Sequence, residues 1–404
     1  MKTAPHPGTP HPSPLPVNGE REKFGTRVAA AALALLLVAC SDKGPVREPA
    51  ELVKIESPEL KAKVVWNHAP GNGSRDLQSR LRLAVESDVI VSADVDGKVY
   101  ALSPEDGHKL WKADTGARLI SGPTVEGPLV LLGTLDAEII ALKRADGTLA
   151  WRTGVSSEVL APPVAHGRFV VARCGDGKLF GLSAEDGKRI WSFDRAVPSL
   201  TLRGLSAPLI VGNTVFAGLD NGHAVSLNLE TGETLWEQVV SAPTGRTELE
   251  RIVDVDADLL PTRDGVYAVS FGGDLAAVSL EDGRVAWRRP IKSYSGIAML
   301  GRTLVVTDEE GFVWALDAES GASIWKQEAL KYRKLSPPAT DGQYFVVADF
   351  EGYVHWLSPK DGRIVARVHA TGDPVVAPMV VQDDKLYVLD TSGEIAVVET
   401  TAVN

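Results

Sequence analysis

A fifteen-residue pattern of apolar and polar positions recurs along the chain. Residues 97–111, with the sequence GKVYALSPEDGHKLW, are its first complete copy. The alternation of apolar residues with period two predicts a strand, the acidic residue and Gly predict a tight turn, and the stretch ending in Trp predicts a second strand. Residues 177–191, 222–236, 273–287 and 311–325 repeat the pattern, residues 137–151 lack its first Gly, and residues 352–366 end in Ala366 instead of Trp.

The ends of successive copies are 38 to 51 residues apart, counted from Trp66 to Ala366. Each interval has room for four short strands. In the third interval, the pattern predicts strands at 163–164, 169–173, 178–183 and 189–193. Four antiparallel strands in about 40 residues are typical of one blade of a β-propeller. The seven intervals therefore predict seven blades.

The chain beyond Ala366 contains only three further predicted strands, at 375–381, 385–390 and 394–398. Residues 63–66 form a lone N-terminal strand that would complete this last sheet. We therefore expect an all-β fold, an eight-bladed β-propeller of four-stranded antiparallel blades over residues 61–404, with the ring closed by N- and C-terminal strands. The alternative, seven blades and a loose N-terminal strand, would leave a sheet edge exposed.

The Trp residues that end the copies are spaced regularly, one for each predicted blade except the one that ends in Ala366. An aromatic set of this kind could stack on a sugar or a quinone. Regular spacing along a repeat array favours packing between neighbouring blades, where each large ring fills the space next to the following repeat.

The N-terminal segment has the layout of an export signal. Basic residues at 21, 23 and 27 precede an apolar run at 28–38 that is too short to span a bilayer. The run ends in Leu-Val-Ala-Cys40, which resembles the lipobox of bacterial lipoproteins. This resemblance implies a signal peptide over 1–39 and acylation of Cys40, and Ser41 in place of Asp favours the outer membrane. The alternative is a secretory signal in which Cys40 is incidental. Residues 40–60, with mixed charge and few apolar side chains, are expected to be the lipidated Cys and a flexible tether.

Charge and cysteine content exclude several classes of function. The formal net charge is −11, which argues against binding to a phosphate backbone and permits a basic protein partner. Once Cys40 is acylated, Cys174 is the remaining thiol, so a disulfide framework is excluded. Cys174 ends a strand-like run and is expected to be a small buried side chain.

Two of the intervals, 191–236 and 236–287, are long because extra residues follow their Trp strand. Both sets of extra residues join an outermost strand to the innermost strand of the next blade, so they must open side by side on one face of the ring. The first connection contains PSLTLRG at 198–204, and the second contains TGRTELERIVDVD at 244–256.

The repeat (Ala-Leu-x-x-x-x-Gly-x-x-x-Trp) resembles that of the quinoprotein-like propellers. Together with the lipobox and the two connection motifs, it is similar to the outer-membrane assembly lipoprotein family BamB, from Cys40 to the end of the chain. The resemblance implies a non-catalytic scaffold at the outer membrane, facing the periplasm. Its implied partners are the periplasmic domains of the central barrel protein and other lipoproteins of the assembly machinery. Nascent outer-membrane proteins are a further candidate partner.

The same resemblance implies which residues bind the partner: Leu200, Leu202 and Arg203 in the first connection, and Asp254 and Asp256 in the second. Exposed apolar residues next to charge suit an interface core with a polar rim. The alternative is that both Leu side chains plug the mouth of the ring and that Arg203 pairs internally with Asp254 or Asp256.

Catalytic sites find little support in the sequence. A quinone-dependent dehydrogenase or a small-ligand-binding propeller is the alternative function, but the vicinal Cys pair often found in those dehydrogenases has no counterpart. Asp94-Val-Asp-Gly97 resembles the start of a calcium loop, yet it lacks the remaining ligands and is better explained as a hairpin turn. The eight His residues are not at metal-ligand spacing. We therefore expect no enzyme activity, no metal and no cofactor.

Overall fold

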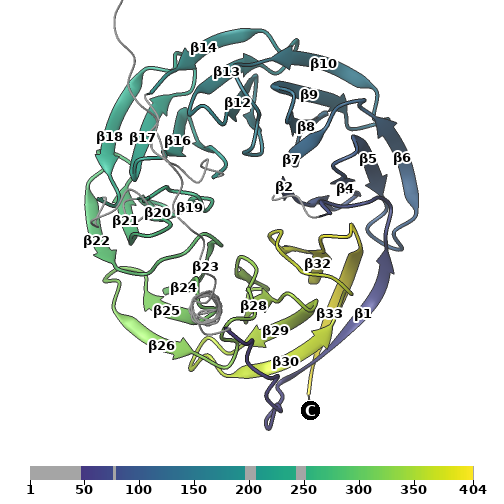
Figure 1. Ribbon diagram of the computed structural model, residues 1–404, viewed down its shortest axis with the longest axis vertical. Helices are drawn as coiled ribbons and strands as arrows, with labels where there is room; N and C mark the ends of the chain where they lie inside the picture. Colours follow the sequence, from purple (N-terminus) through teal and green to yellow (C-terminus); the bar gives the residue numbers. More distant parts are fainter. Residues whose placement is uncertain (1–46, 76–78, 196–205, 243–251, 404) are drawn as a thin grey trace, which may run out of the picture. The chain divides into compact units, whose positions relative to one another are not determined.

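Small β-sheets surround a central opening in this protein (Figure 1). The structure is a computed structural model that describes residues 47–75, 79–195, 206–242 and 252–403. The chain from Pro49 onward forms one unit, and its described elements are all strands. The described ranges contain no helix with the length and apolar character that a membrane crossing requires.

Seven blades consist of four strands that follow one another in the chain and pair antiparallel. The first strand of each blade lies next to the opening and the fourth forms the outer rim (Figure 1). In chain order the blades are β3–β6 (Ala84–Glu86, Val89–Ala93, Lys98–Leu102, Lys109–Asp114), β7–β10 (Leu119–Glu126, Leu129–Thr134, Glu138–Lys143, Leu149–Gly154), β11–β14 (Val164–His166, Phe169–Arg173, Leu179–Ser183, Arg189–Phe193), β15–β18 (Leu209–Val211, Thr214–Gly218, His223–Asn228, Thr234–Val239), β19–β22 (Leu260–Pro261, Gly265–Val269, Leu275–Ser279, Val285–Arg289), β23–β26 (Ile297–Leu300, Thr303–Thr307, Val313–Asp317, Ser323–Gln327) and β27–β30 (Ala339–Thr340, Phe345–Ala348, Tyr353–Leu357, Ile364–His369).

The eighth blade joins the two ends of the described chain. Its first three strands are β31 (Val380–Gln382), β32 (Lys385–Leu389) and β33 (Ile395–Ala402), and its outermost strand is β1 (Leu60–His68). β1 pairs antiparallel with β33, with Leu60 opposite Ala402 and His68 opposite Ile395. The predicted eight-bladed ring and its closure by N- and C-terminal strands are therefore confirmed, and the seven-bladed alternative is wrong. One short strand, β2 (Arg80–Leu81), was not predicted; it pairs in parallel with β7.

The tryptophans of seven outermost strands connect each blade to the next one in the same way. The indole N–H of Trp151 donates to the backbone carbonyl of Ala184, 2.9 Å away in the turn before β14. Gly187 in that turn has a positive φ, and a Cβ added to it would lie 2.5 Å from the indole. A side chain at this position would therefore block the docking of Trp151. The other six donor and acceptor pairs are Trp66 and Pro104, Trp111 and Arg144, Trp191 and Leu229, Trp236 and Leu280, Trp287 and Ala318, and Trp325 and Pro359. The prediction that these rings pack between blades is confirmed.

Ala366 in β30 takes the position that Trp has in the other blades. The blade that follows it has no turn before its outermost strand, because that strand is β1 from the other end of the chain. An indole at 366 would therefore have no turn to dock against. Instead, Leu60, Ala62 and Val64 of β1 pack on the core that contains buried Ala366.

The alternating strand directions assign every loop to one of two faces. Connections from an outermost strand to the next blade lie on the same face as the turns between second and third strands; we call it the connection face. The turns between first and second strands and between third and fourth strands lie on the other face, the turn face. Both long connections singled out in the sequence therefore open on the connection face.

Candidate functional site

The predicted partner-binding residues are only partly within the described ranges. Leu200, Leu202 and Arg203 lie outside the described residues, as does Cys40. Asp254 and Asp256 belong to the connection from β18 to β19, and their side chains are only 0% and 4% exposed. The two carboxylates that sequence analysis assigned to an interface are therefore buried in the isolated chain.

Close backbone packing holds the segment that contains these aspartates. The Val255 amide donates to the Leu219 carbonyl at 3.3 Å, and the Phe271 amide donates to the Asp254 carbonyl at 2.9 Å. A Cβ added to Gly218 would lie 2.5 Å from the Val255 side chain, so a larger residue at 218 would push the segment away. The segment is thus fixed between the fourth and fifth blades, β15–β18 and β19–β22.

A buried ion pair lies under the end of the first long connection. Arg173 at the end of β12 pairs with Asp220 at 2.5 Å, and both side chains are buried. The same guanidinium donates to the Ser206 hydroxyl at 3.0 Å. Because Ser206 directly follows the part of this connection that is not described, Arg173 fixes where that part rejoins the ring.

Asp258 connects the two long connections to each other. Its carboxylate accepts a hydrogen bond from the Ala207 amide at 2.8 Å and pairs with Arg82 at 2.9 Å. Burial disfavours the charged form of Asp258, but the charges of Arg82 and Arg80 outweigh it, so the pKa of Asp258 lies below its usual value. Asp258 therefore remains ionised at neutral pH and holds the first connection next to the second.

Arg80 reaches this cluster from the segment that follows β1. β2 lies at the central opening beside β7, opposite β19 (Figure 1). The Arg80 guanidinium donates to the backbone carbonyl of Asp256 at 2.8 Å. On the connection face, Arg80 thereby joins β2, which pairs with the second blade, to the connection that enters the fifth blade.

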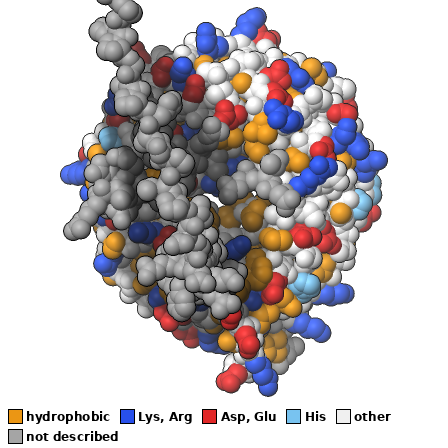
Figure 2. Space-filling model, viewed as in Figure 1, with side chains coloured by type: hydrophobic (Ala, Val, Ile, Leu, Met, Phe, Trp, Pro, Cys, Tyr) orange, Lys and Arg blue, Asp and Glu red, His pale blue; other side chains and the backbone are white. Residues whose placement is uncertain are grey.

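The arrangement is suited to positioning backbone rather than to chemistry. Arg173 and Asp220 form a buried ion pair, and removing one member of such a pair costs about 3–5 kcal/mol because the other charge is left unpaired. Across the described ranges, no group of three or more His, Cys, Asp or Glu side chains could hold a metal ion. Figure 2 shows basic and acidic side chains interspersed over the described part of one face, without a large area of one sign.

Two other features noted in the sequence have structural explanations. The Asp94 carboxylate accepts hydrogen bonds from the backbone amides of Asp96 and Lys98, at 3.1 and 3.0 Å, in the turn between β4 and β5. This confirms the hairpin-turn interpretation. Cys174 is buried as expected, and burial raises the pKa of its thiol to about 11, so it stays protonated and unreactive.

The sequence analysis did not identify the residues that hold the two long connections in place: Arg80, Arg82, Arg173 and Asp258. Arg173 offered a signal, since a charged residue inside the apolar strand 169–173 requires a buried partner. Asp258 continues the acidic run that includes Asp254 and Asp256. Arg80 and Arg82 offered no signal, because their partners lie more than 170 residues away in the sequence.

Comparison with known proteins gives a consistent result. A family model described as outer membrane protein assembly factor BamB matches residues 95–327. A relative of that name from Alkalilimnicola ehrlichii is 50% identical over 369 residues, which cover 91% of this chain and 95% of the relative. The crystal structure of BamB from Moraxella catarrhalis has a TM-score of 0.77 at 26% identity and covers 84% of this chain and 100% of that chain.

A quinohemoprotein alcohol dehydrogenase from Comamonas testosteroni is also similar, with a TM-score of 0.68 over 83% of this chain and 76% of that chain. At 12% identity this likeness shows a common propeller fold alone. The family model, by contrast, spans more than half of the chain, and the Alkalilimnicola relative is half identical over nearly all of it. This chain belongs to the BamB family of outer membrane protein assembly factors.

Proposed function

We propose that this chain is a non-catalytic scaffold lipoprotein of the machinery that assembles outer-membrane proteins. Through its connection face it would dock on the periplasmic domains of the central barrel protein, with other lipoproteins of the machinery as further partners. Its relatives are named as assembly factors, and a scaffold needs surfaces of fixed shape rather than reactive groups.

The observation that carries this proposal is the joining of the two long connections by Asp258. The Ala207 amide of one connection donates to a carboxylate of the other at 2.8 Å. This bond holds the described ends of two neighbouring connections together, and preorganisation of a binding surface lowers the entropy lost on binding.

Within that surface, Leu200 and Leu202 would supply apolar contact and Arg203 would fix register. The burial of Asp254 and Asp256 supports an indirect role for these two residues. They would shape the connection that contacts the partner, from the inner side of that connection. Their replacement would therefore weaken docking by displacing the loop.

Binding of purified variants to the periplasmic domains of the central barrel protein tests the interface. Replacing Leu200 and Leu202 together by Ala should weaken binding by about 2 kcal/mol or more, roughly 30-fold in Kd. A matched control is the double variant of Leu110 and Leu149, which lie on outermost strands and are 48% and 55% exposed. That control should bind normally.

Thermal unfolding of the same variants separates an interface from a structural plug. We expect the melting temperature of the Leu200→Ala, Leu202→Ala variant to stay close to that of the parent protein. Normal binding combined with melting many degrees lower would contradict the proposal, because the two Leu side chains would then fill the mouth of the ring.

Anchoring to the outer membrane through acylated Cys40 is part of the same proposal. Intact-mass measurement of protein isolated from membranes should show the mass of three acyl chains at the new N-terminus. Cys40→Ser should lack that mass and be released from membranes, since the stable anchor is lost. An unmodified Cys40 in the parent protein would refute the anchor.

The propeller fold shared with quinohemoprotein dehydrogenases makes one further test worthwhile. A redox quinone and Ca²⁺ added together to the purified protein should leave the melting temperature unchanged, because a ligand that does not bind cannot stabilise the folded state. A saturable increase would show a small-ligand site and contradict the purely scaffolding role.

A further inference from the structure

The segment between the predicted lipid anchor and β1 is attached to the ring. Residues 49–59, which we call the strap, run along the sixth and seventh blades, β23–β26 and β27–β30. The Ala50 amide donates to the Lys331 carbonyl at 2.9 Å, and the Glu59 amide donates to the Val365 carbonyl at 3.1 Å. This part of the predicted tether is therefore docked at both of its ends.

Three arginines hold strap carbonyls at intervals of three or four residues. Arg333 donates to the carbonyl of Ala50 at 3.0 Å, Arg367 to that of Val53 at 3.0 Å, and Arg363 to that of Ser57 at 2.9 Å. Hydrogen bonds from a charged donor are stronger than those between neutral groups. Because all three acceptors are backbone atoms, the contacts fix the path of the strap.

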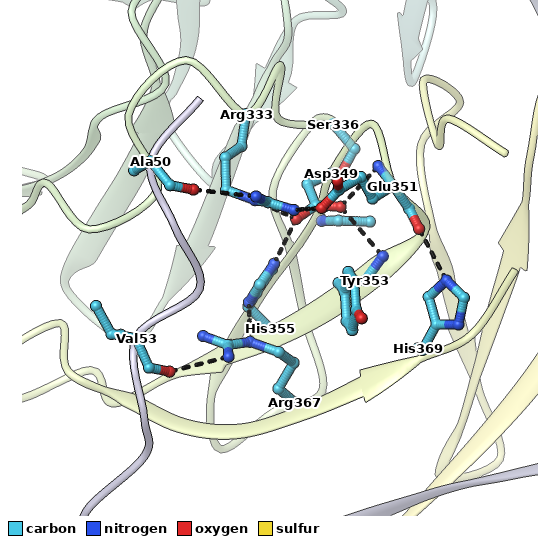
Figure 3. A network of polar contacts seen from close by, with 11 residues as sticks. Ala50, Val53, Arg333, Ser336, Asp349, Glu351, Tyr353, His355, Arg367 and His369 are labelled. Carbon is cyan, nitrogen blue, oxygen red and sulfur yellow. Dashed lines mark hydrogen bonds and ion pairs between the residues drawn. The ribbon is translucent and has the colours of Figure 1, made fainter. Parts of the chain in front are cut away.

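A single buried carboxylate organises two of these arginines (Figure 3). Asp349 accepts from the Nε of Arg333 at 2.6 Å and from the Nε2 of His355 at 3.0 Å. The other ring nitrogen of His355, Nδ1, accepts from the Nε of Arg367 at 3.0 Å. Asp349 thus orients Arg333 directly and Arg367 through a neutral His355. A network of this kind serves the strap, because both guanidinium groups end on its carbonyls.

Side chains of the strap add to its attachment. Ile55 packs on the core cluster that contains Leu330 and Phe345. Glu59 accepts from the Tyr344 hydroxyl at 2.8 Å and pairs with Arg363. The Val53 side chain, in contrast, is 45% exposed. Ile55 is therefore packed against the ring, whereas Val53, two positions before it, faces solvent.

The strap crosses from one face of the ring to the other. Lys331 and Arg333 belong to the connection from β26 to β27, and Asp349 belongs to the turn between β28 and β29; both are on the connection face. Arg363 and Tyr344 flank turns on the turn face. The N-terminal end of the strap therefore leaves the ring on the connection face, and its other end enters β1 on the turn face.

We propose that the strap brings the lipid tether out on the connection face and makes that face, at the sixth and seventh blades, the membrane-proximal side of the ring. This inference rests on the proposed acylation of Cys40. With the strap docked, eight residues lie between Cys40 and Pro49, and this stretch can span at most roughly 30 Å. An undocked tether of twenty residues reaching Leu60 on the turn face would span up to roughly 70 Å.

Substitutions in the strap provide a matched pair for testing the attachment. Ile55→Asp places a charge in an apolar core and should release the strap while β1 and the ring stay folded. Val53→Asp makes the same chemical change two residues away at an exposed site. Hydrogen exchange of the Ala50 amide should accelerate at least tenfold in Ile55→Asp and remain unchanged in Val53→Asp. Equal exchange in both variants would overturn the docked strap.

Energy transfer to a labelled lipid tests the orientation. Lipidated full-length protein with Cys174→Ser is placed on vesicles of phosphatidylethanolamine and phosphatidylglycerol that contain an acceptor lipid. A dye is attached to the thiol introduced by Lys292→Cys on the connection face or by Gln343→Cys on the turn face. Both native side chains are exposed. Transfer should be stronger from 292 than from 343, and the difference should shrink in Ile55→Asp but not in Val53→Asp.

The outcomes separate the anchor from the strap. Equal or reversed transfer from the two positions in the parent protein would overturn the orientation. Protein that does not float with the vesicles would refute the lipid anchor and the orientation together. The exchange measurement is made without membranes, so it decides independently whether the strap is held on the ring.

Discussion

The junction between the seventh and eighth blades differs from the seven other junctions of the ring. In the seven, a Trp docks on a turn of the next blade, and donor and acceptor are near in the sequence: Trp151 and Ala184 are 33 residues apart. In the eighth, Ala366 stands in place of Trp, and contact depends on β1. Just before β1, the Glu59 amide donates to the Val365 carbonyl of β30 at 3.1 Å across 306 residues.

This difference shows how one architecture uses two kinds of interaction. A docked indole requires only the neighbouring repeat, so the same solution can be copied seven times. The closing blade has no turn to dock on, and apolar side chains of β1 instead pack on the core that contains Ala366. The strap then adds charged hydrogen bonds at the seventh blade, where Arg363 and Arg367 belong to or adjoin β30.

The largest expected effect comes from removing the closing strand. Deletion of residues 60–66 should lower the free energy of unfolding by at least about 5 kcal/mol and cause aggregation, because β33 becomes an exposed edge. Urea unfolding and light scattering measure these two effects. An unchanged unfolding midpoint would mean that closure contributes nothing to stability.

Replacing one docked indole should have a smaller but still large effect. Trp151→Ala removes a buried aromatic ring and its hydrogen bond to Ala184, and we expect a loss of about 3–5 kcal/mol. Trp151→Phe keeps a ring without the donor and should lose about 1–2 kcal/mol. If urea unfolding shows equal losses for both variants, the hydrogen bond is unimportant and ring volume alone joins the blades.

The reverse substitution at the eighth junction sharpens the comparison. Ala366→Trp restores the repeat pattern, but Ala366 is buried and the next blade offers no docking turn. We expect a loss of about 1–3 kcal/mol from overpacking. A gain in the free energy of unfolding for this variant would show that the eighth junction can accept the same docking as the other seven.

The smallest expected effect is a dependence of stability on pH near the strap. Burial lowers the pKa of His355, although Asp349 opposes the shift. Arg333 and Arg367 also lie in this network, and Tyr353 packs next to His355. Below about pH 6.5, His355 is protonated in the unfolded chain but stays neutral in the folded protein. The free energy of unfolding therefore decreases as the pH is lowered, until the pH reaches the lowered pKa of His355 in the folded protein.

His355→Gln removes this titration. Below pH 6.5 the variant should lose stability with pH less steeply than the parent protein, by up to about 1.4 kcal/mol per pH unit. The free energy of unfolding is measured by urea titration at several pH values. Identical slopes would mean that His355 is protonated equally in the folded and unfolded states. Docked indoles carry no titrating group, so the seven indole junctions do not contribute to this difference.

The repeat made most of the ring predictable. Period-two alternation, a turn Gly and a Trp four residues later recur with the blade, and the three strands left after Ala366 required β1 as the fourth. The strap was not predictable, because its acceptors are backbone carbonyls that leave no mark in the sequence. The contacts of Asp258 were missed for a related reason: one donor is the Ala207 amide, and the other partner, Arg82, is 176 positions away.

Closure by β1 also sets an order of events during synthesis. In β33, its partner, Ile395 pairs with His68 across 327 residues, so β1 waits for its partner while the seven blades between them are made. Until then the growing protein is an open array with an unpaired edge, although its blades can dock one after another through local contacts. The strap docks on β30 and on the connection between β26 and β27, so it too waits until seven blades exist. A truncated chain would therefore carry the proposed lipid anchor on a long undocked tether, whereas the docked strap of the complete ring leaves only a short one.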